Sequence, residues 1–246
     1  MLRQKRLGVY SFLTALLMLC LFAGTFTVAN SAVEVPKPPT VSREDWGSKP
    51  QTIPDSRKQT PVWITIHHAG EVWEAGADPA EFVRHMQVWG QNRPTLEKPP
   101  RDTYWPDLPY HFLIAPDGRI FEGRPVIYEP ETNTKYSVNG NIGIEMMGDF
   151  EKQRPSLEQL RSCVALTAWL SDKYHIDLDH VRTHMDAAPD QTDCPGRDFY
   201  RYIKDGQFKK WVAETLAGKK PQVKASAPLP DGPLESVLGA FSKRLE

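Results

Sequence analysis

Residues 62–67 read VWITIH, and this stretch sets the fold that the rest of the chain must complete. Its side chains alternate with a period of two, which predicts a β-strand with Val62, Ile64 and Ile66 on one face and Trp63, Thr65 and His67 on the other. The apolar face predicts a strand in the core. This core strand ends at a histidine.

Helix signals follow at three places along the chain. An Asp78 cap precedes apolar residues at helical spacing over residues 79–89. A Ser-Gln capping-box pattern opens residues 156–174, which keep the spacing of an amphipathic helix. Residues 199–212 predict a further helical region, interrupted near Gly206.

Strand signals lie between these helices. Residues 110–123, YHFLIAPDGRIFEG, are two short apolar runs around a Pro-Asp-Gly turn, which predicts a hairpin. Residues 141–147, NIGIEMM, predict another strand. Glu145 is a charged residue within this otherwise apolar strand, and packing alone does not explain it. Alternating strands and helices predict an α/β fold with a single mixed central β-sheet and packed helices.

Length and charge limit the classes of function. A chain of 246 residues is long enough for one well-buried domain plus appendages. The formal net charge of -1 gives no basic footprint, so we expect no nucleic-acid partner. We expect a monomer.

The first 32 residues have the pattern of a secretory signal. Basic residues precede a long apolar stretch, and small residues follow it near Ala29–Ala32. A retained N-terminal anchor is the alternative, because the apolar stretch Gly8–Val28 is nearly long enough to span a bilayer. We expect an exported protein, periplasmic or extracellular, with a membrane contact only if this segment is retained.

Removal of the signal leaves two cysteines, Cys163 and Cys194. One disulfide would be the plain expectation for an exported protein. Their surroundings argue against it, because Cys163 falls on the apolar stripe of a predicted helix and Cys194 lies in the loop sequence DQTDCPG.

A long proline-rich loop over residues 90–109 carries Tyr104 and Trp105. These aromatic side chains could stack on a sugar ring, or they could pin the loop to the surface.

Two of the seven histidines have a context that suggests metal binding. His67 ends the buried strand, and His184 lies ten residues before Cys194 in THMDAAPDQTDCPG. Two imidazoles and one thiolate would give zinc three ligands and leave a fourth position open, which is the arrangement of a catalytic site. On spacing alone this grouping is a hypothesis, because the fold must bring His67 to the other two.

Five ordered segments give the chain a family resemblance. SREDWGSKP, VWITIHHAG, PYHFLIAPDGRIFEGRP, NIGIEMMGDF and THMDAAPDQTDCPG resemble the successive motifs of the type 2 N-acetylmuramoyl-L-alanine amidases, a superfamily that includes the peptidoglycan recognition proteins and phage lysozyme-type amidases. The resemblance runs from about Ser42 to Tyr200. It implies the amidase type 2 fold, a zinc cofactor, and peptidoglycan or muropeptides as partners.

The resemblance also implies the roles of individual residues. The zinc ligands would be His67, His184 and Cys194, with His68 a neighbour and Asp193 the nearest competitor for the third position. Catalytic roles would fall to three other residues, which are Glu145 as general base, Tyr110 as a group that positions water or the carbonyl, and Thr192, two positions before the third ligand, where the family often has lysine.

Two of these side chains also have a purely structural interpretation. Glu145 could instead form an ion pair with Arg119 or Arg124. Tyr110 could be an ordinary core tyrosine. The lysine-to-threonine difference leaves the identity of the oxyanion stabiliser open.

Composition predicts the domain organisation. Proline and polar residues predict an extended lead-in over residues 33–60, and the resemblance implies that the folded domain, residues 41–215, is a zinc amidase domain. Residues 216–233 predict a flexible linker, and residues 234–246 a short tail helix of unknown role.

The expected activity is zinc-dependent hydrolysis of the amide between the lactyl group of N-acetylmuramic acid and L-alanine. Two alternatives stay open: a peptidoglycan-binding module that does not cut, and a zinc peptidase that cuts another bond of the stem peptide.

Overall fold

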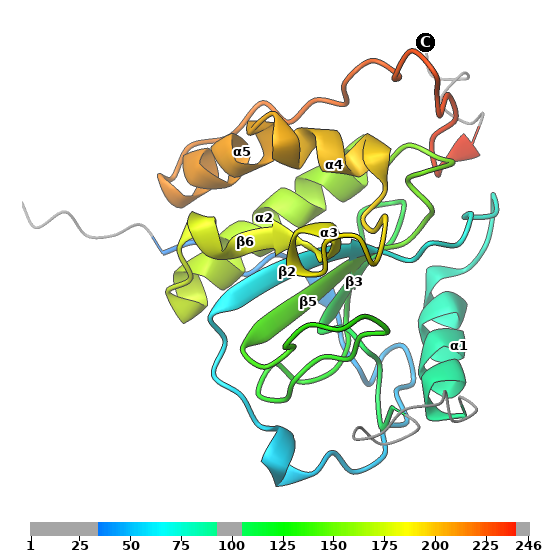
Figure 1. The fold of residues 1–246 in the computed structure, drawn as a ribbon, viewed down its shortest axis with the longest axis vertical. Helices are drawn as coiled ribbons and strands as arrows, with labels where there is room; N and C mark the ends of the chain where they lie inside the picture. The colour runs from blue at the N-terminus through cyan, green and yellow to red at the C-terminus, as the bar shows by residue number, and fades with distance from the viewer. Residues whose placement is uncertain (1–33, 93–104, 240–246) are drawn as a thin grey trace, which may run out of the picture. The chain divides into compact units, whose positions relative to one another are not determined.

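Within the described residues, six strands form one mixed β-sheet in the order β1-β4-β3-β5-β2-β6 (Figure 1). The computed structural model describes residues 34–92 and 105–239. Only β3 and β4 pair antiparallel among these strands of the described chain; the other neighbours are parallel. The strands are β1 Thr40–Val41, β2 Trp63–His68, β3 Phe112–Ile114, β4 Ile120–Glu122, β5 Asn141–Met146 and β6 Val181–Thr183. The predicted single mixed sheet is confirmed.

Helices cover the sheet. They are α1 Pro79–Gln91, α2 Leu157–Tyr174, α3 His184–Ala187, α4 Arg197–Lys204 and α5 Gln207–Leu216, with single 3-10 turns at Asp55–Arg57 and Leu178–His180. Figure 1 shows α2, α4 and α5 stacked together, and α1 standing apart from them. The break between α4 and α5 falls at Gly206, as predicted, where the backbone is left-handed with φ of 78°.

The long helices begin where their caps predict. The Asp78 side chain accepts a hydrogen bond from the Ala80 amide, and Pro79 occupies the first turn of α1. At α2 both halves of the Ser156–Gln159 capping box are present.

The predicted hairpin is formed by β3 and β4. Its turn contains Gly118, whose φ of +86° favours glycine. The Ser162 hydroxyl of α2 donates to the Gly118 carbonyl, which ties the turn to the helix.

Besides the two 3-10 turns, the described chain contains two strands and one helix that were not predicted. The lead-in contributes β1, which pairs with β4 at the edge of the sheet. The strand β6 and the single-turn helix α3 follow α2 and complete the other edge. These elements depend on their neighbours for hydrogen bonds, because two to four residues are too few to show a period.

The C-terminal segment runs over α4 without regular structure. Residues 217–233 form no helix or strand, and the Arg201 guanidinium donates to the Ala227 carbonyl at 2.6 Å. In the described part of the predicted tail helix, Ser236 forms a bridge with Arg154, followed by a turn. Residues 240–246 lie outside the described chain.

No helix within residues 34–92 and 105–239 is long and apolar enough to cross a membrane. The predicted signal or anchor, residues 1–32, lies outside the described residues.

Candidate metal centre

Two parallel neighbouring strands bring His67 and His184 together. The paired residues of β2 and β6 end with Ile66 opposite Thr183, and each histidine is the next residue along its chain. Both side chains therefore lie at the carboxyl ends of adjacent strands, where ligands commonly bind α/β sheets. The two imidazole centroids are 4.6 Å apart.

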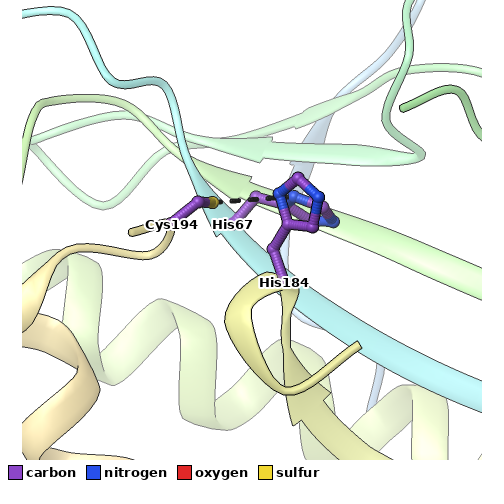
Figure 2. Close-up of side chains that lie close together, drawn as sticks. All are labelled: His67, His184 and Cys194. Atoms are coloured by element: carbon purple, nitrogen blue, oxygen red, sulfur yellow. Dashed lines mark hydrogen bonds between the residues drawn. The ribbon is translucent and has the colours of Figure 1, made fainter. Parts of the chain in front are cut away.

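Cys194 reaches the same point from the loop after α3. Its Sγ lies 3.7 Å from His67 Nδ1, and the ligand atoms of Cys194, His67 and His184 all lie within 4.8 Å of one another (Figure 2). The backbone of the loop is fixed by the Met185 amide, which donates to the Cys194 carbonyl at 2.7 Å. The sequence-predicted ligand set is thus brought together in space.

The neighbouring candidates lie outside this cluster. The Asp193 side chain is exposed and is not part of it. The His68 Nδ1 accepts a hydrogen bond from the Phe150 amide at 3.1 Å. The backbone amide of His68 donates a hydrogen bond to the Cys194 sulfur at 3.3 Å, which helps to position the thiol.

The donor set and spacing fit a zinc ion. Zinc in proteins takes nitrogen ligands at about 2.0–2.1 Å and thiolate at about 2.3 Å, so a tetrahedral site separates nitrogen from sulfur by roughly 3.5 Å. The 3.7 Å between His67 Nδ1 and Cys194 Sγ is close to that value. All three side chains are buried, and such polar donors need a partner in the interior.

Electrostatics at the cluster favour neutral imidazoles. Burial, followed by the nearby His184 and His68, lowers the pKa of His67 well below its usual value. Burial, followed by His68, lowers the pKa of His184 to about 4. Burial raises the pKa of the Cys194 thiol, and a bound cation is the partner that stabilises a buried thiolate.

Glu145 lies beside the cluster as a buried carboxyl group. Its Cα pairs with that of His67 across β5 and β2, and its side chain is fully buried. Neither carboxyl oxygen has a hydrogen-bond partner within the described residues. Burial, followed by the charge of Glu71, raises its pKa well above the usual value. Buried ionisable groups without partners are characteristic of functional sites.

The ion-pair alternative for Glu145 is not what the structure contains. Arg119 pairs with Asp117 at 2.7 Å, and Arg124 pairs with Glu131 at 2.9 Å. Both guanidinium groups are therefore engaged elsewhere.

The two other predicted catalytic residues border the same cluster. The ring of Tyr110 lies 5.0 Å from that of His67, and burial, followed by the charge of Glu145, raises the pKa of its hydroxyl. The Thr192 hydroxyl accepts a hydrogen bond from the Cys194 amide at 3.1 Å. Thr192 therefore shapes the turn that presents the cysteine.

A groove of about 350 Å³ is lined by Tyr110 and Glu145. Its other lining residues include Met86 and Trp89 of α1, together with Trp105 and Asn133. A mainly apolar lining with a few polar groups is typical of a ligand site.

Trp105 is packed against the protein, as expected if it pins the loop to the surface. It is 9% exposed, its amide donates to the Gly90 carbonyl at 2.9 Å, and its ring lies 5.4 Å from that of Trp89. Trp89 is 54% exposed and is the more open aromatic surface of the groove. Tyr104 lies outside the described residues.

One contact of the cluster was not anticipated. The Thr134 hydroxyl lies 2.6 Å from His184 Nε2, and the Thr132 hydroxyl lies 3.3 Å from the same atom. Both threonines belong to an irregular segment in which periodicity gives no signal.

Comparison with known proteins agrees with this geometry. The family model described as N-acetylmuramoyl-L-alanine amidase matches residues 57–197, more than half of the chain. The chain belongs to this amidase family. The match contains all three residues of the cluster, together with Glu145, Tyr110 and Thr192.

Relatives of this amidase-family chain include recognition proteins and amidases. Peptidoglycan-recognition protein SD of Drosophila simulans is 29% identical over 203 residues, which cover 78% of this chain and 97% of that protein. The amidase LysC of Clostridium intestinale has 26% identity and a TM-score of 0.52, covering 70% of this chain and 98% of its own.

A second similar structure is a complex with tracheal cytotoxin. A Drosophila peptidoglycan recognition protein LB variant in complex with tracheal cytotoxin has 26% identity and a TM-score of 0.54, covering 67% of this chain and 92% of its own. The fold and the peptidoglycan connection are therefore shared between proteins named for cutting and proteins named for recognition.

Proposed function

We propose that this protein is a zinc-dependent amidase that hydrolyses the bond between the lactyl group of N-acetylmuramic acid and L-alanine in peptidoglycan. The observation that supports it most is the complete cluster of His67, His184 and Cys194 beside the unpartnered carboxyl of Glu145. A module that only binds its ligand has no need of an isolated buried carboxyl group at this position.

Zinc held by His67, His184 and Cys194 would supply Lewis-acid activation of water and of the scissile carbonyl. The chain must then move one proton from the attacking water to the leaving alanine amine. Glu145 is the carboxyl placed to accept that proton and to return it. It must be ionised to do so, and a positive charge beside it favours the ionised form.

Tyr110 and the groove would orient the substrate. The Tyr110 hydroxyl remains protonated at neutral pH because its pKa is raised, so it can donate a hydrogen bond to the carbonyl oxygen as negative charge develops there. The stem peptide would lie along the wall of α1, with its alanine end at Tyr110 and Glu145.

We propose that the protein acts outside the cytoplasm, in the periplasm or beyond the cell. The pattern of the first 32 residues supports this location, and peptidoglycan lies in the same compartment.

Digestion of purified peptidoglycan tests the proposed activity. The mature protein, the protein with a zinc chelator and a Cys194→Ser variant are compared, and the soluble products are analysed by mass. We expect intact stem peptides with a free N-terminal alanine from the zinc-loaded protein only. Binding of peptidoglycan without any soluble product would instead support the recognition function, and stem fragments cut at another bond would support the peptidase.

A further inference from the structure

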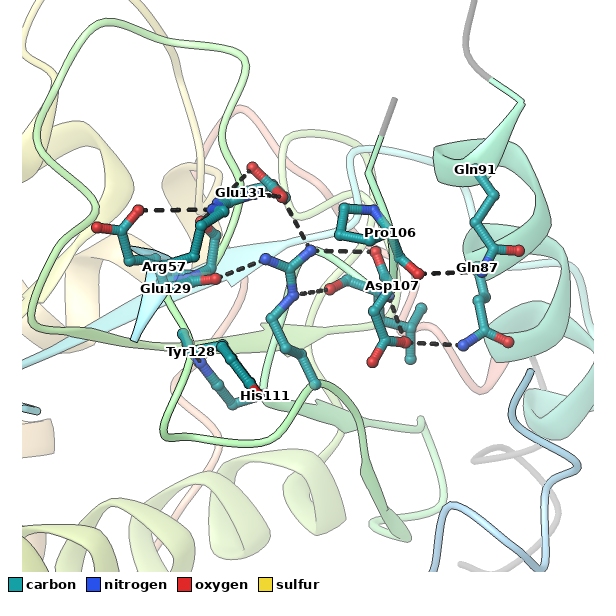
Figure 3. A network of polar contacts seen from close by, with 12 residues as sticks. Arg57, Gln87, Gln91, Pro106, Asp107, His111, Tyr128, Glu129 and Glu131 are labelled. Atoms are coloured by element: carbon teal, nitrogen blue, oxygen red, sulfur yellow. Dashed lines mark hydrogen bonds and ion pairs between the residues drawn. The ribbon is translucent and has the colours of Figure 1, made fainter. Parts of the chain in front are cut away.

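The segment Glu131–Thr134 connects a buried ion-pair network to the metal cluster. At its start, the Glu131 carboxylate accepts hydrogen bonds from Arg57 at 2.5 Å and from Arg124 at 2.9 Å (Figure 3). The Glu131 and Arg124 side chains are almost fully buried. A buried, paired carboxylate of this kind holds the start of the segment in a fixed position.

The other end of the segment is tied to the cysteine loop. The Lys135 amide donates to the Gln191 side chain at 2.8 Å, and Gln191 lies three residues before Cys194. The segment is therefore held at both ends, once by the core and once by the loop that supplies the sulfur ligand.

Between these anchors the two threonine hydroxyls converge on one histidine nitrogen. Thr134 Oγ1 lies 2.6 Å from His184 Nε2 and 2.9 Å from Thr132 Oγ1. The Thr134 amide also donates to Thr132 Oγ1 at 3.2 Å. Thr134 is therefore oriented by its neighbour, and its own hydroxyl occupies the Nε2 side of the imidazole.

We propose that Thr134 is a positioning residue for the metal site: it accepts the Nε2 proton of His184 and so presents Nδ1 to the metal. The proposal rests on the proposed zinc-dependent function and adds a residue to it. A metal-bound histidine generally donates from its other ring nitrogen, and that hydrogen bond fixes both the tautomer and the ring orientation. Here the acceptor is a neutral hydroxyl on a segment anchored from the core.

The proton arrangement is consistent at each atom. His184 Nε2 donates to Thr134 Oγ1, and the Thr134 hydroxyl proton is then free to be donated to Thr132 Oγ1. His184 Nδ1 keeps its lone pair. The adjacent Asn133 lines the groove, so the same segment contacts both the metal ligand and the space for substrate.

Zinc affinity of three variants tests the proposal. Thr134→Val keeps the shape but removes the hydroxyl, and Thr134→Ser keeps the hydroxyl. Thr215→Val is the matched control, because its hydroxyl bonds only within α5 in the described structure. Affinity is measured by competition with a chromogenic chelator, and melting of the metal-free proteins is recorded in parallel.

We expect Thr134→Val to bind zinc about 10–100-fold more weakly, which is the usual effect of removing such a partner. Thr134→Ser and Thr215→Val should match the wild type. Cobalt-substituted Thr134→Val should also show an altered visible spectrum, which a remote loss of stability would not produce.

Equal zinc affinity of Thr134→Val and wild type would overturn the role of Thr134 and leave the amidase proposal intact. A serine variant as weak as the valine variant would also overturn it, because the hydroxyl would then not be the cause. Absence of zinc binding by the wild type would contradict both proposals.

Discussion

Glu145 and His67 are cross-strand partners at the carboxyl ends of β5 and β2, so a fully buried carboxyl group lies next to a metal-ligand candidate. The sheet register itself sets this relationship, because residues opposite each other on parallel strands stay neighbours. If either strand shifted by one residue, its side chains would turn to the other face, and Glu145 and His67 would lie on opposite sides of the sheet.

Replacement of Glu145 by glutamine should separate chemistry from metal binding. Glu145→Gln keeps the volume of the side chain but cannot take up a proton, so we expect kcat to fall by about 10²–10⁴-fold. Zinc content, measured by atomic spectrometry, should stay at the wild-type level. Glu158→Gln, at an exposed position in the first turn of α2, is the control and should keep full activity. A Glu145→Gln enzyme with normal kcat would remove Glu145 from the reaction.

Trp89 should affect substrate binding more than chemistry. It is half exposed on the wall of the groove, and truncation removes apolar contact surface without opening the core. We expect Trp89→Ala to raise KM about tenfold, equivalent to ~1.4 kcal/mol, with kcat little changed. Val88→Ala on the same helix, equally exposed and outside the groove lining, is the control. Unchanged KM in steady-state assays on soluble muropeptides would place the substrate elsewhere.

His111 should make the fold sensitive to acid. Burial lowers its pKa to about 3, and its neutral ring accepts from the Gly143 amide and bonds the Tyr128 carbonyl. The unfolded chain binds a proton near pH 6.5 and the folded chain does not, so stability is full above that pH and falls as pH drops towards 3.

The loss assigned to His111 should reach about 3 kcal/mol by pH 4. We expect His111→Gln to be less stable at pH 7 and to lose less stability on acidification, as measured by urea unfolding at several pH values. His85→Gln, at an exposed position, should follow the wild-type profile. Parallel profiles for His111→Gln and wild type would show that His111 does not carry this dependence.

The buried network around Glu131 should contribute strongly to stability. Glu131→Gln leaves the buried Arg124 guanidinium without its carboxylate, and breaking such a pair costs about 3–5 kcal/mol. Asp55→Asn breaks the exposed pair with Lys58 and should cause no detectable change. Urea unfolding of both variants tests the contrast. Similar small effects in the two variants would mean that the buried network is not needed for the fold.

Long patterned segments were predictable from the sequence, and short ones were not. The core strand β2, the helices α1 and α2 and the hairpin follow from period and caps, which are local properties. The strands β1 and β6 exist because neighbouring strands offer hydrogen bonds, and such pairing is not visible in two or three residues.

The site residues also differ in whether the sequence predicts them. His67 stood out as the histidine at the end of a core strand, but its proximity to His184 depends on the pairing of β2 with β6. The family resemblance implies this proximity, whereas the spacing of the residues along the chain does not. Thr134 had no signal in the sequence, because its role comes from a segment anchored by Glu131 far from the other ligands along the chain.

Hydrolysis in water labelled with heavy oxygen tests the central claim most directly. A soluble muropeptide is incubated with the zinc-loaded protein, and the position of the label is found by mass spectrometry. We predict that the label enters the lactyl carboxylate of N-acetylmuramic acid, that the released peptide is unlabelled, and that Cys194→Ser incorporates none. Label in a carboxyl group of the peptide would identify a peptidase, and absence of label with the zinc-loaded wild type would contradict the account.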